Sequence, residues 1–485
     1  MSGRRLGQIT LRLLLSGILT SIFCGAVSAQ LGSDMATSLA NHMEYSFSTE
    51  TNNEILENWL DADFYFDAFT AGLRMELYQP SEVHTLEEDI TFRYFEYHRD
   101  DIDVRVGNYY AMFGRGLVLR TYEDRNIRID NNLEGIKIGL SHNRLSATFL
   151  SGRPEGSSGE RTDLLHGADL TLNPIERVAV GGSYLSNSPD RRKKAEITSG
   201  RMELSLSSHN WVWDMYGEYG ERTNPQGTGA YLSSSLTTAG FGLSFEYKYY
   251  DTFFFRTDDY NVTYNNPPSL VREHAYTLLN RHPHVLDADD EAGIQIEATF
   301  SPSMNTALLA NYSLTKDHEG KTIWGEGKTL FEEGYGEFEH HFNDAFFSIG
   351  ALSVSEQGPD TYVTPIFEST YSLDEVNSLR FVFQHQHTKS QTLGEFDNQI
   401  YSLEYARSPR FTLSLVGEWT NKSDVQKMPG EKSFWLFGKL DVNISPNHDL
   451  SVMYGSRQAG FICAGGVCRY EPEFEGIEVK LFSRL

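Results

Sequence analysis

Hydrophobic and polar residues alternate along most of the chain. In an early segment Met43, Tyr45 and Phe47 share one face, whereas Glu44 and Ser46 share the other. The same period recurs in the runs 69–77, 241–249, 308–314, 411–419 and 434–444. Because successive side chains of a strand point to opposite faces, each run predicts a strand with one apolar and one polar face.

The connections between these runs alternate between short turns and longer polar loops. Short turns are predicted at 67–68, 98–101, 141–144, 173–176, 208–210, 237–240, 301–305, 343–344, 372–377, 407–409 and 445–449. Longer loops are predicted at 49–58, 78–89, 113–132, 152–163, 186–200, 221–227, 251–290, 317–328, 355–361, 388–396, 422–432 and 459–473. Membrane barrels have this asymmetry, with short periplasmic turns and long extracellular loops. The pattern predicts an all-β fold: a single transmembrane antiparallel β-barrel of about 24 strands, within a range of about 20 to 26.

The last eleven residues predict a strand that closes the barrel. Ile477, Val479, Leu481 and Leu485 fall on one face of this segment. It resembles the terminal strand that outer-membrane assembly machinery recognises, so this machinery is an expected partner during biogenesis. Pairing the first strand with the last removes the exposed sheet edges that hydrocarbon does not tolerate.

Composition agrees with an exported barrel. The 41 basic and 67 acidic residues give a net charge of −26, which argues against binding to nucleic acid or attraction to anionic lipid. The 26 Tyr, 30 Phe and 6 Trp suit aromatic girdles at the two membrane interfaces. Outer-membrane lipid is therefore the expected surrounding, and the bacterial outer membrane the expected location.

The first 29 residues predict a cleavable secretory signal. Arg4 and Arg5 precede a mostly apolar stretch at 11–23, and Val27-Ser28-Ala29 offers small residues for cleavage after Ala29. A lipoprotein signal would use Cys24 instead. The expected domains are thus the signal 1–29 and the barrel 30–485.

Two cysteines remain after the signal. Cys463 and Cys468 are separated by four residues in a chain that we expect to reach an oxidising compartment. A local disulfide across a hairpin tip is the expected state. The alternative, a metal-binding pair, lacks a second Cys or His pair at a suitable spacing.

The loop 113–132 is the third long connection and is rich in charge. The candidate residues for a pore constriction are Arg115, Arg120, Glu123, Asp124, Arg125, Arg128 and Asp130. If the loop folds inward, its Arg and carboxylate groups would create a field across the lumen that discriminates between ions. The alternative is that these arginines merely pair with neighbouring acids at the base of the loop.

The loop 251–290 is too long for a simple connection, so we expect it to be functional or disordered. It could fold inward as a plug or cover the barrel as a surface cap. The candidate plug residues are Tyr264, Pro267, Pro268, Arg272, His274 and Arg281. The two prolines could start a short helix with Leu270, His274 and Leu278 on one stripe. The acidic run 287–291 fits no defined calcium loop and is interpreted as a solvated entrance to the next strand.

No catalytic motif is present, and we expect neither an enzyme nor a cofactor. The sequence contains no Gly-x-Ser-x-Gly, His-Glu-x-x-His or phosphate-loop motif. His385 and His387 share a face with Phe381 and Phe383, so they should point outward and not into a lumenal site. His282 and His284 remain candidates for a metal, although no metal site is predicted.

Three motifs carry a resemblance to a known family. They are FGRGLVLRTYEDRNIRIDNNLEG at 113–135, YNNPPSLVREHAYTLLNRHPH at 264–284 and CAGGVCRYEPEFEG at 463–476. The chain resembles an uncharacterised, porin-like outer-membrane family of the Bacteroidota type. The resemblance implies a barrel in the outer membrane and no established substrate.

The function expected from these features is a porin-like channel for passive or selective passage of small hydrophilic solutes, narrowed by the inward loop. The alternative is a non-conducting barrel that serves as a surface scaffold or as a component of an envelope assembly with an unknown protein partner. A barrel hydrolase is a third, weaker interpretation.

Overall fold

The computed structural model describes residues 35–79, 87–155, 160–161, 163–189, 193–257, 262–318, 327–427, 432–464 and 466–485. The predicted signal segment 1–29 lies outside the described residues. No helix among the described residues has the length and apolar character needed to cross a membrane.

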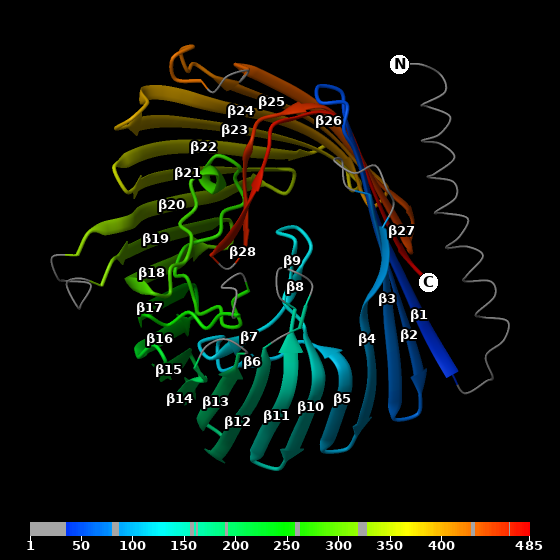
Figure 1. Ribbon diagram of the computed structural model, residues 1–485. Coiled ribbons are helices and arrows are strands. Elements are labelled where there is room, and N and C mark those ends of the chain that lie inside the picture. Colours follow the sequence, from blue (N-terminus) through cyan, green and yellow to red (C-terminus); the bar gives the residue numbers. More distant parts are fainter. Residues whose placement is uncertain are drawn as a thin grey trace.

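Twenty-four antiparallel strands form one closed sheet, as predicted (Figure 1). The strands are β1 (Met35–Ser48), β2 (Glu54–Phe66), β3 (Phe69–Gln79), β4 (Glu87–Arg99), β5 (Ile102–Tyr109), β10 (Leu133–His142), β11 (Leu145–Pro154), β12 (Leu164–Ile175), β13 (Val178–Ser188), β14 (Ala195–Ser208), β15 (Trp211–Thr223), β16 (Gly227–Thr238), β17 (Phe241–Asp251), β18 (Asp290–Ser303), β19 (Thr306–Lys316), β20 (Thr329–Asn343), β21 (Phe346–Gln357), β22 (Asp360–Ser372), β23 (Asn377–Ser390), β24 (Gly394–Arg407), β25 (Phe411–Thr420), β26 (Phe434–Ser445), β27 (His448–Arg457) and β30 (Phe474–Arg484). The terminal strand β30 pairs with both β27 and β1, so the sheet closes on itself.

The predicted alternation of connections is confirmed. The eleven predicted short turns all overlap connections at one end of the barrel, which we call the short-turn rim. The connections β5–β10, β17–β18 and β27–β30 all lie at the other end, the long-loop rim. The loop 113–132 is therefore the third connection at the long-loop rim, as predicted.

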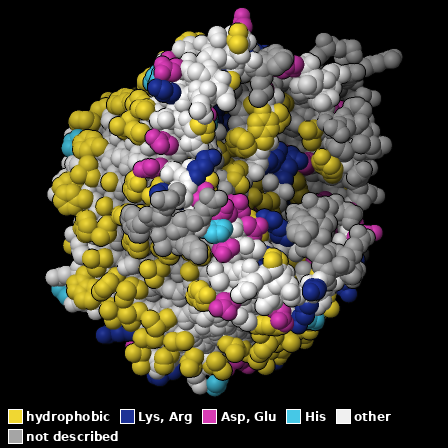
Figure 2. Space-filling view, turned by 60° about the vertical axis from the view of Figure 1, so that its left-hand side comes forward, with side chains coloured by type: hydrophobic (Ala, Val, Ile, Leu, Met, Phe, Trp, Pro, Cys, Tyr) yellow, Lys and Arg dark blue, Asp and Glu magenta, His cyan; other side chains and the backbone are white. Residues whose placement is uncertain are grey.

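The outer face of the barrel is apolar. On the neighbouring strands β24 and β25, Leu403 and Leu415 are 51% and 52% exposed, whereas Glu404 and Ser414, one residue away on each strand, lie on the inner face. Figure 2 shows hydrophobic side chains over much of the outer surface, with acidic and basic side chains gathered near the centre of the view. A continuous exposed apolar surface on a closed sheet fits hydrocarbon and not water.

The predicted strand faces also hold for β23. Gln384 and Gln386 are buried on the inner face, and His385 and His387 alternate with them and interact with the outward Asp397. The two histidines thus point outward, as the parity predicted.

Six short strands and one short helix lie outside the large sheet. They are β6 (Met112–Phe113), β7 (Leu119–Arg120), β8 (Glu123–Asp124), β9 (Ile129–Asp130), the 3₁₀ helix η1 (Leu279–Arg281), β28 (Gly460–Ala464) and β29 (Val467–Glu471). Figure 1 shows these elements inside the ring of large strands. We call the segments that carry them the three inner segments: 110–132, 252–289 and 458–473.

The prediction of a helix that begins at Pro267-Pro268 is wrong. The structure has no helix at 267–274, and Leu270 adopts a φ of +55°, which a right-handed helix does not allow. The backbone here bonds to the barrel wall: the Pro268 carbonyl accepts from the Tyr250 hydroxyl and the Ser269 carbonyl from the Lys248 ammonium. Because the wall binds these carbonyls, they do not accept the backbone hydrogen bonds of a helix.

Candidate functional site

The three inner segments are joined to one another by hydrogen bonds, each of which involves a backbone carbonyl. The Arg120 N–H donates to the Tyr264 carbonyl at 2.8 Å, which joins 110–132 to 252–289. The Leu286 N–H donates to the Gly466 carbonyl at 3.0 Å, which joins 252–289 to 458–473. The Arg469 guanidinium donates to the Asn126 carbonyl at 3.3 Å and completes the set. The three segments therefore form one internal assembly.

An apolar core fixes this assembly to one side of the inner wall. Lumen-facing residues of β10 to β14 form an apolar strip: Leu133, Leu150, Leu165, Leu185 and Ile197. The inner segments pack Phe113, Leu117, Leu119, Phe253, Phe255 and Tyr264 against this strip. Each fully buried large side chain contributes about 1.5–3 kcal/mol, so this core stabilises the attachment of the inner segments to the wall.

On a nearby part of the wall, formed by β2 and β3, the β8–β9 hairpin is attached by ion pairs. Arg74 of β3 is 8% exposed and donates to Asp61 at 2.6 Å and to Glu123 at 2.8 Å. It also lies 3.5 Å from Asp130. Arg125 donates to Asp61 at 3.0 Å and to Glu123 at 2.7 Å. The hairpin and the wall thus share one alternating network of charges.

Two further side chains of the inner segment 110–132 stabilise this attachment. Arg128 forms a bidentate pair with Glu57 of β2, whose side chain is buried. The Tyr110 hydroxyl donates to Asp130 at 3.0 Å. Burial, together with the nearby Asp130 carboxylate, raises the pKa of Tyr110, so the hydroxyl keeps its proton.

The structure separates the charged residues predicted as one constriction group. Arg125, Arg128, Glu123 and Asp130 join the network on β2 and β3. The Asp124 carboxylate instead accepts from the Asn126 backbone N–H within its own turn. Arg120 stacks on Tyr122, and Arg115 reaches β15 and β16; neither forms an ion pair within the described ranges.

Replacing Arg74 with Gln should release the β8–β9 hairpin. Three carboxylates would lose their shared cation in a largely buried setting, which costs roughly 3 kcal/mol. Hydrogen exchange of the 122–131 amides in the detergent-solubilised protein should accelerate accordingly. Arg93→Gln provides the control, because Arg93 is 67% exposed and its pair with Glu134 is worth less than about 1 kcal/mol. Equal protection in both variants would show that the ion pairs do not hold the hairpin.

The inner segment 252–289 runs along the inner wall from β17 to β25. Its side chains meet wall carboxylates of β18, β20, β22 and β25 in the pairs Arg272–Glu297, His274–Glu333, Tyr276–Glu368 and Arg281–Glu418. Its backbone is held as well, since the Leu278 N–H donates to Gln384 and the Leu278 carbonyl accepts from Gln386. The segment lies against the wall inside the ring and does not cover the rim as a surface cap.

The entrance to β18 contains a fully buried charge cluster. Lys248 and Glu291 are both 0% exposed, and the Lys248 ammonium donates to Glu291 at 2.5 Å and to the Ser269 carbonyl at 2.6 Å. His284 lies 2.7 Å from the second Glu291 oxygen. The sequence interpretation of a solvated acidic entrance is therefore wrong for Glu291, whose neighbours in 252–289 bury it.

His282 and His284 do not converge on one site. His282 stacks on Tyr362, with ring centroids 3.9 Å apart, and contacts Gln386. Burial lowers the pKa of His282 to about 4, so the ring is neutral at neutral pH. Within the described part of the chain no group of three or more His, Cys, Asp or Glu side chains is arranged to hold a metal.

The predicted disulfide is present. Cys463 and Cys468 are bonded and sit opposite each other in the β28–β29 hairpin. This hairpin reaches into the lumen, where Gly466 at its tip contacts both Ser269 and Leu286. The disulfide therefore closes the hairpin that joins the inner assembly.

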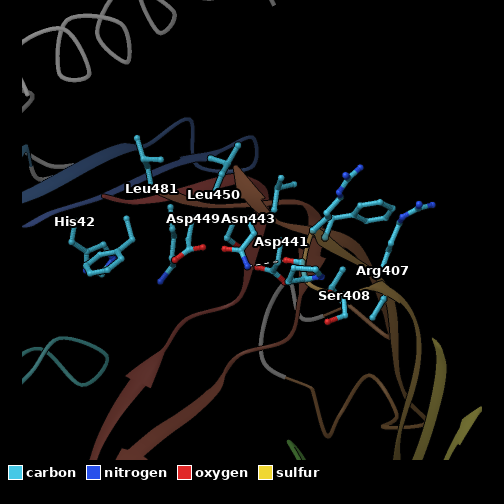
Figure 3. Close-up of a pocket in the computed structure, with 17 residues that line it drawn as sticks. His42, Arg407, Ser408, Asp441, Asn443, Asp449, Leu450 and Leu481 are labelled. Carbon is cyan, nitrogen blue, oxygen red and sulfur yellow. Dashed lines mark hydrogen bonds between the residues drawn. The ribbon is translucent and has the colours of Figure 1, made fainter. Parts of the chain in front are cut away.

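The short-turn rim has its own cavity of about 630 Å³, at the closure of the barrel. Figure 3 shows Asp441, Asn443 and Asp449 of β26 and β27 among the residues that line this cavity, together with Leu450 and Leu481. The Asn443 amide donates to the Pro409 carbonyl at 2.8 Å, so it fixes the adjacent turn. The polar groups of this cavity thus stabilise the turns of the short-turn rim. The cavity lies away from the inner assembly.

Sequence reasoning missed the wall partners of the inner segments. Glu57, Asp61 and Arg74 are lumen-facing residues of β2 and β3 near the long-loop rim, and Lys248 occupies such a position on β17. A signal was present, because charged residues at inward positions of a strand need a partner or water. The apolar strip was a second signal, since leucine at a lumen-facing position departs from the polar interior of a barrel.

The fold is similar to solved outer-membrane barrels at low sequence identity. The structure of the translocation pore of the P pilus usher (PapC) matches with a TM-score of 0.50 and 8% identity, covering 93% of this chain and 99% of that chain. A P pilus tip assembly intermediate from E. coli, PapC-PapD-PapK-PapG, matches with a TM-score of 0.53 and 8% identity, covering 94% of this chain and 61% of that chain. At this identity the likeness extends to the fold alone.

At the level of sequence, no curated protein matches the chain. A family model described as "Family of unknown function (DUF6029)" matches residues 8–485. Because the match includes nearly the whole sequence, the chain belongs to this family of unknown function.

Proposed function

We propose that this protein is a channel of the bacterial outer membrane for small hydrophilic solutes. The closed sheet leaves no strand edge unpaired, and its exposed leucines and aromatic residues match a lipid environment. The inner face carries Asp, Glu, Arg, Ser and Thr side chains that can replace part of a solute's hydration. Passage would need no catalysis, and we propose no enzymatic step.

The internal assembly is the observation that carries this proposal. An unobstructed barrel of 24 strands would leave a lumen wide enough for large molecules. The three inner segments cross this space, attached by an apolar core on β10 to β14 and by ion pairs on β2 and β3. Such a constriction, attached to two parts of the wall, would restrict passage to small solutes.

Reconstitution in planar bilayers tests the proposal. The purified protein should give discrete conductance steps, and liposomes that contain it should admit small sugars faster than large ones. The same preparation after heat unfolding is the control. A folded preparation that neither conducts nor admits small sugars would rule out the channel.

A second candidate is a non-conducting barrel that acts as a surface scaffold or envelope-assembly component. The mutual bonding of the three inner segments favours it, because a sealed lumen needs such contacts. A folded protein that never conducts and co-purifies with a stable envelope partner would support this alternative.

A further inference from the structure

A second cavity of about 630 Å³ lies on the inner wall, between the inner segment 110–132 and the short-turn rim. Arg115 of the inner segment lines one end of the cavity. Glu176 and Arg177, in the turn after β12, line the end at the short-turn rim. The inner faces of β14 to β17 form its floor with a run of serine, tyrosine and carboxylate side chains. This surface belongs to the barrel wall and is separate from the network on β2 and β3.

Arg115 is held in place at this cavity without an ion pair. Its guanidinium lies 4.3 Å from the centre of the Tyr216 ring and donates to the Ser233 hydroxyl at 2.8 Å. It also lies 3.5 Å from the Tyr231 hydroxyl. Stacking and hydrogen bonding to neutral groups orient the cation, which forms no ion pair with a carboxylate of the described residues.

Carboxylates surround this cation on the wall. Glu203 sits opposite Tyr216 in the sheet, and Glu246 sits opposite Ser233. Asp214 is the residue two before Tyr216 on β15, on the same face. Hydroxyls orient two of the acids: Tyr231 donates to Glu246 at 2.9 Å and Ser205 to Asp214 at 2.6 Å.

These groups differ from the other charged groups of the lumen. Three other cations of the inner segments are neutralised by the wall, in the pairs Arg125–Asp61, Arg128–Glu57 and Arg281–Glu418. At this cavity, within the described residues, neither the cations Arg115 and Arg177 nor the anions Glu176, Glu203, Asp214 and Glu246 form an ion pair. The cavity thus presents fixed charges of both signs to water.

The spacing of these charges is set by the strand geometry. Arg115 contacts the wall at the level of Tyr216 and Ser233, whereas Asp214 lies two residues nearer the short-turn rim. Two residues of a strand span about 7 Å. A cation and an anion at this separation match a short aliphatic chain with opposite charges at its two ends.

We propose that this cavity binds small zwitterionic solutes on their way through the lumen. The solute carboxylate would bind Arg115, and its ammonium group would bind Asp214, with Glu203 and Glu246 adding to the negative field. The lining has two cations and four anions, a net charge of 2 − 4 = −2, so lone anions should bind poorly. The inference rests on the proposed channel function and names the solute class of that channel.

Three probes with the same five-carbon chain test the inference: 5-aminopentanoate, pentanoate and pentylamine. Binding to the detergent-solubilised protein is measured by titration calorimetry, and interruptions of the ion current are measured in bilayers. We expect 5-aminopentanoate to bind at least about tenfold more tightly than either single-charge probe, since each charged contact adds a factor of this order.

Two variants test which residue binds each charged end of 5-aminopentanoate. Arg115→Gln should weaken 5-aminopentanoate about tenfold and leave pentylamine unchanged, whereas Asp214→Asn should weaken both amines and leave pentanoate unchanged. The matched control is Arg120→Gln, because Arg120 is also an arginine of this segment without an ion pair among the described residues, but it lies outside the cavity lining. This control should bind like the wild type.

The outcomes separate the two proposals. A conducting protein that binds 5-aminopentanoate no better than pentanoate or pentylamine overturns the zwitterion site and leaves the channel intact. A protein that never conducts overturns the channel, and the calorimetric comparison still decides the site. If Arg115→Gln and Arg120→Gln weaken 5-aminopentanoate binding equally, the zwitterion site is also overturned. The effect would then come from the segment as a whole and not from the charge in the cavity.

Discussion

Excising 271–283 should raise the single-channel conductance several-fold. This stretch lies inside the ring along β18 to β25, so its removal widens the water-filled section that ions cross. The excision is geometrically simple. Gly466 lies against both Ser269 and Leu286, so the neighbouring ends of the cut, Leu270 and His284, are close enough for a short Gly-Ser linker to join them.

The anchors on either side of the excision remain. Phe255 and Tyr264 keep their places in the apolar core, and the Lys248–Glu291 pair is retained. Thr277→Ala is the control, because Thr277 is exposed within the same stretch. The variants are compared in planar bilayers at one salt concentration. An unchanged conductance would mean that the stretch lies beside the ion path and does not narrow it.

Replacing Glu291 with Ala should produce the largest single-residue loss of stability. The ammonium of Lys248 would remain fully buried without its counter-charge, which costs about 3–5 kcal/mol. Because the same ammonium donates to the Ser269 carbonyl, and Glu291 also holds His284, the inner segment 252–289 should detach first. Protease cleavage within 265–289 and hydrogen exchange of its amides measure the detachment.

Two controls test whether the loss of stability comes from the buried charge. The double variant Lys248→Met with Glu291→Leu removes both charges and should recover most of the stability, since an apolar pair has no uncompensated ion. Glu395→Ala breaks an ion pair whose side chains are 72% and 60% exposed, and it should change the stability by less than about 1 kcal/mol. If the double variant is as unstable as Glu291→Ala, volume and not charge is responsible.

The sequence predicted the barrel well because its signal is local. A strand in a membrane barrel repeats every two residues, so the inward and outward faces of β23 and β24 could be read without knowing any neighbour. The turns are equally local, since a few polar residues must separate two apolar runs. The Cys463–Cys468 bond spans only five positions, so it too could be expected from spacing.

The internal assembly could not be predicted in the same way. Its contacts join residues far apart in the chain, such as Arg281 with Glu418 and Arg469 with Asn126. The expected helix after Pro267-Pro268 failed for this reason: the Pro268 and Ser269 carbonyls and the Leu278 N–H are all satisfied by the wall. Local propensity was outweighed by tertiary hydrogen bonds.

The sequence alone therefore predicts about 24 strands, their faces, their closure and the loops long enough to enter the lumen, because each of these depends on a short repeating pattern. Only the tertiary structure separates Arg115, exposed beside Glu203 and Asp214, from Arg128, neutralised by Glu57. The two arginines are alike in sequence. Their difference arises because closing a sheet of 24 strands brings each of them to a different part of the wall.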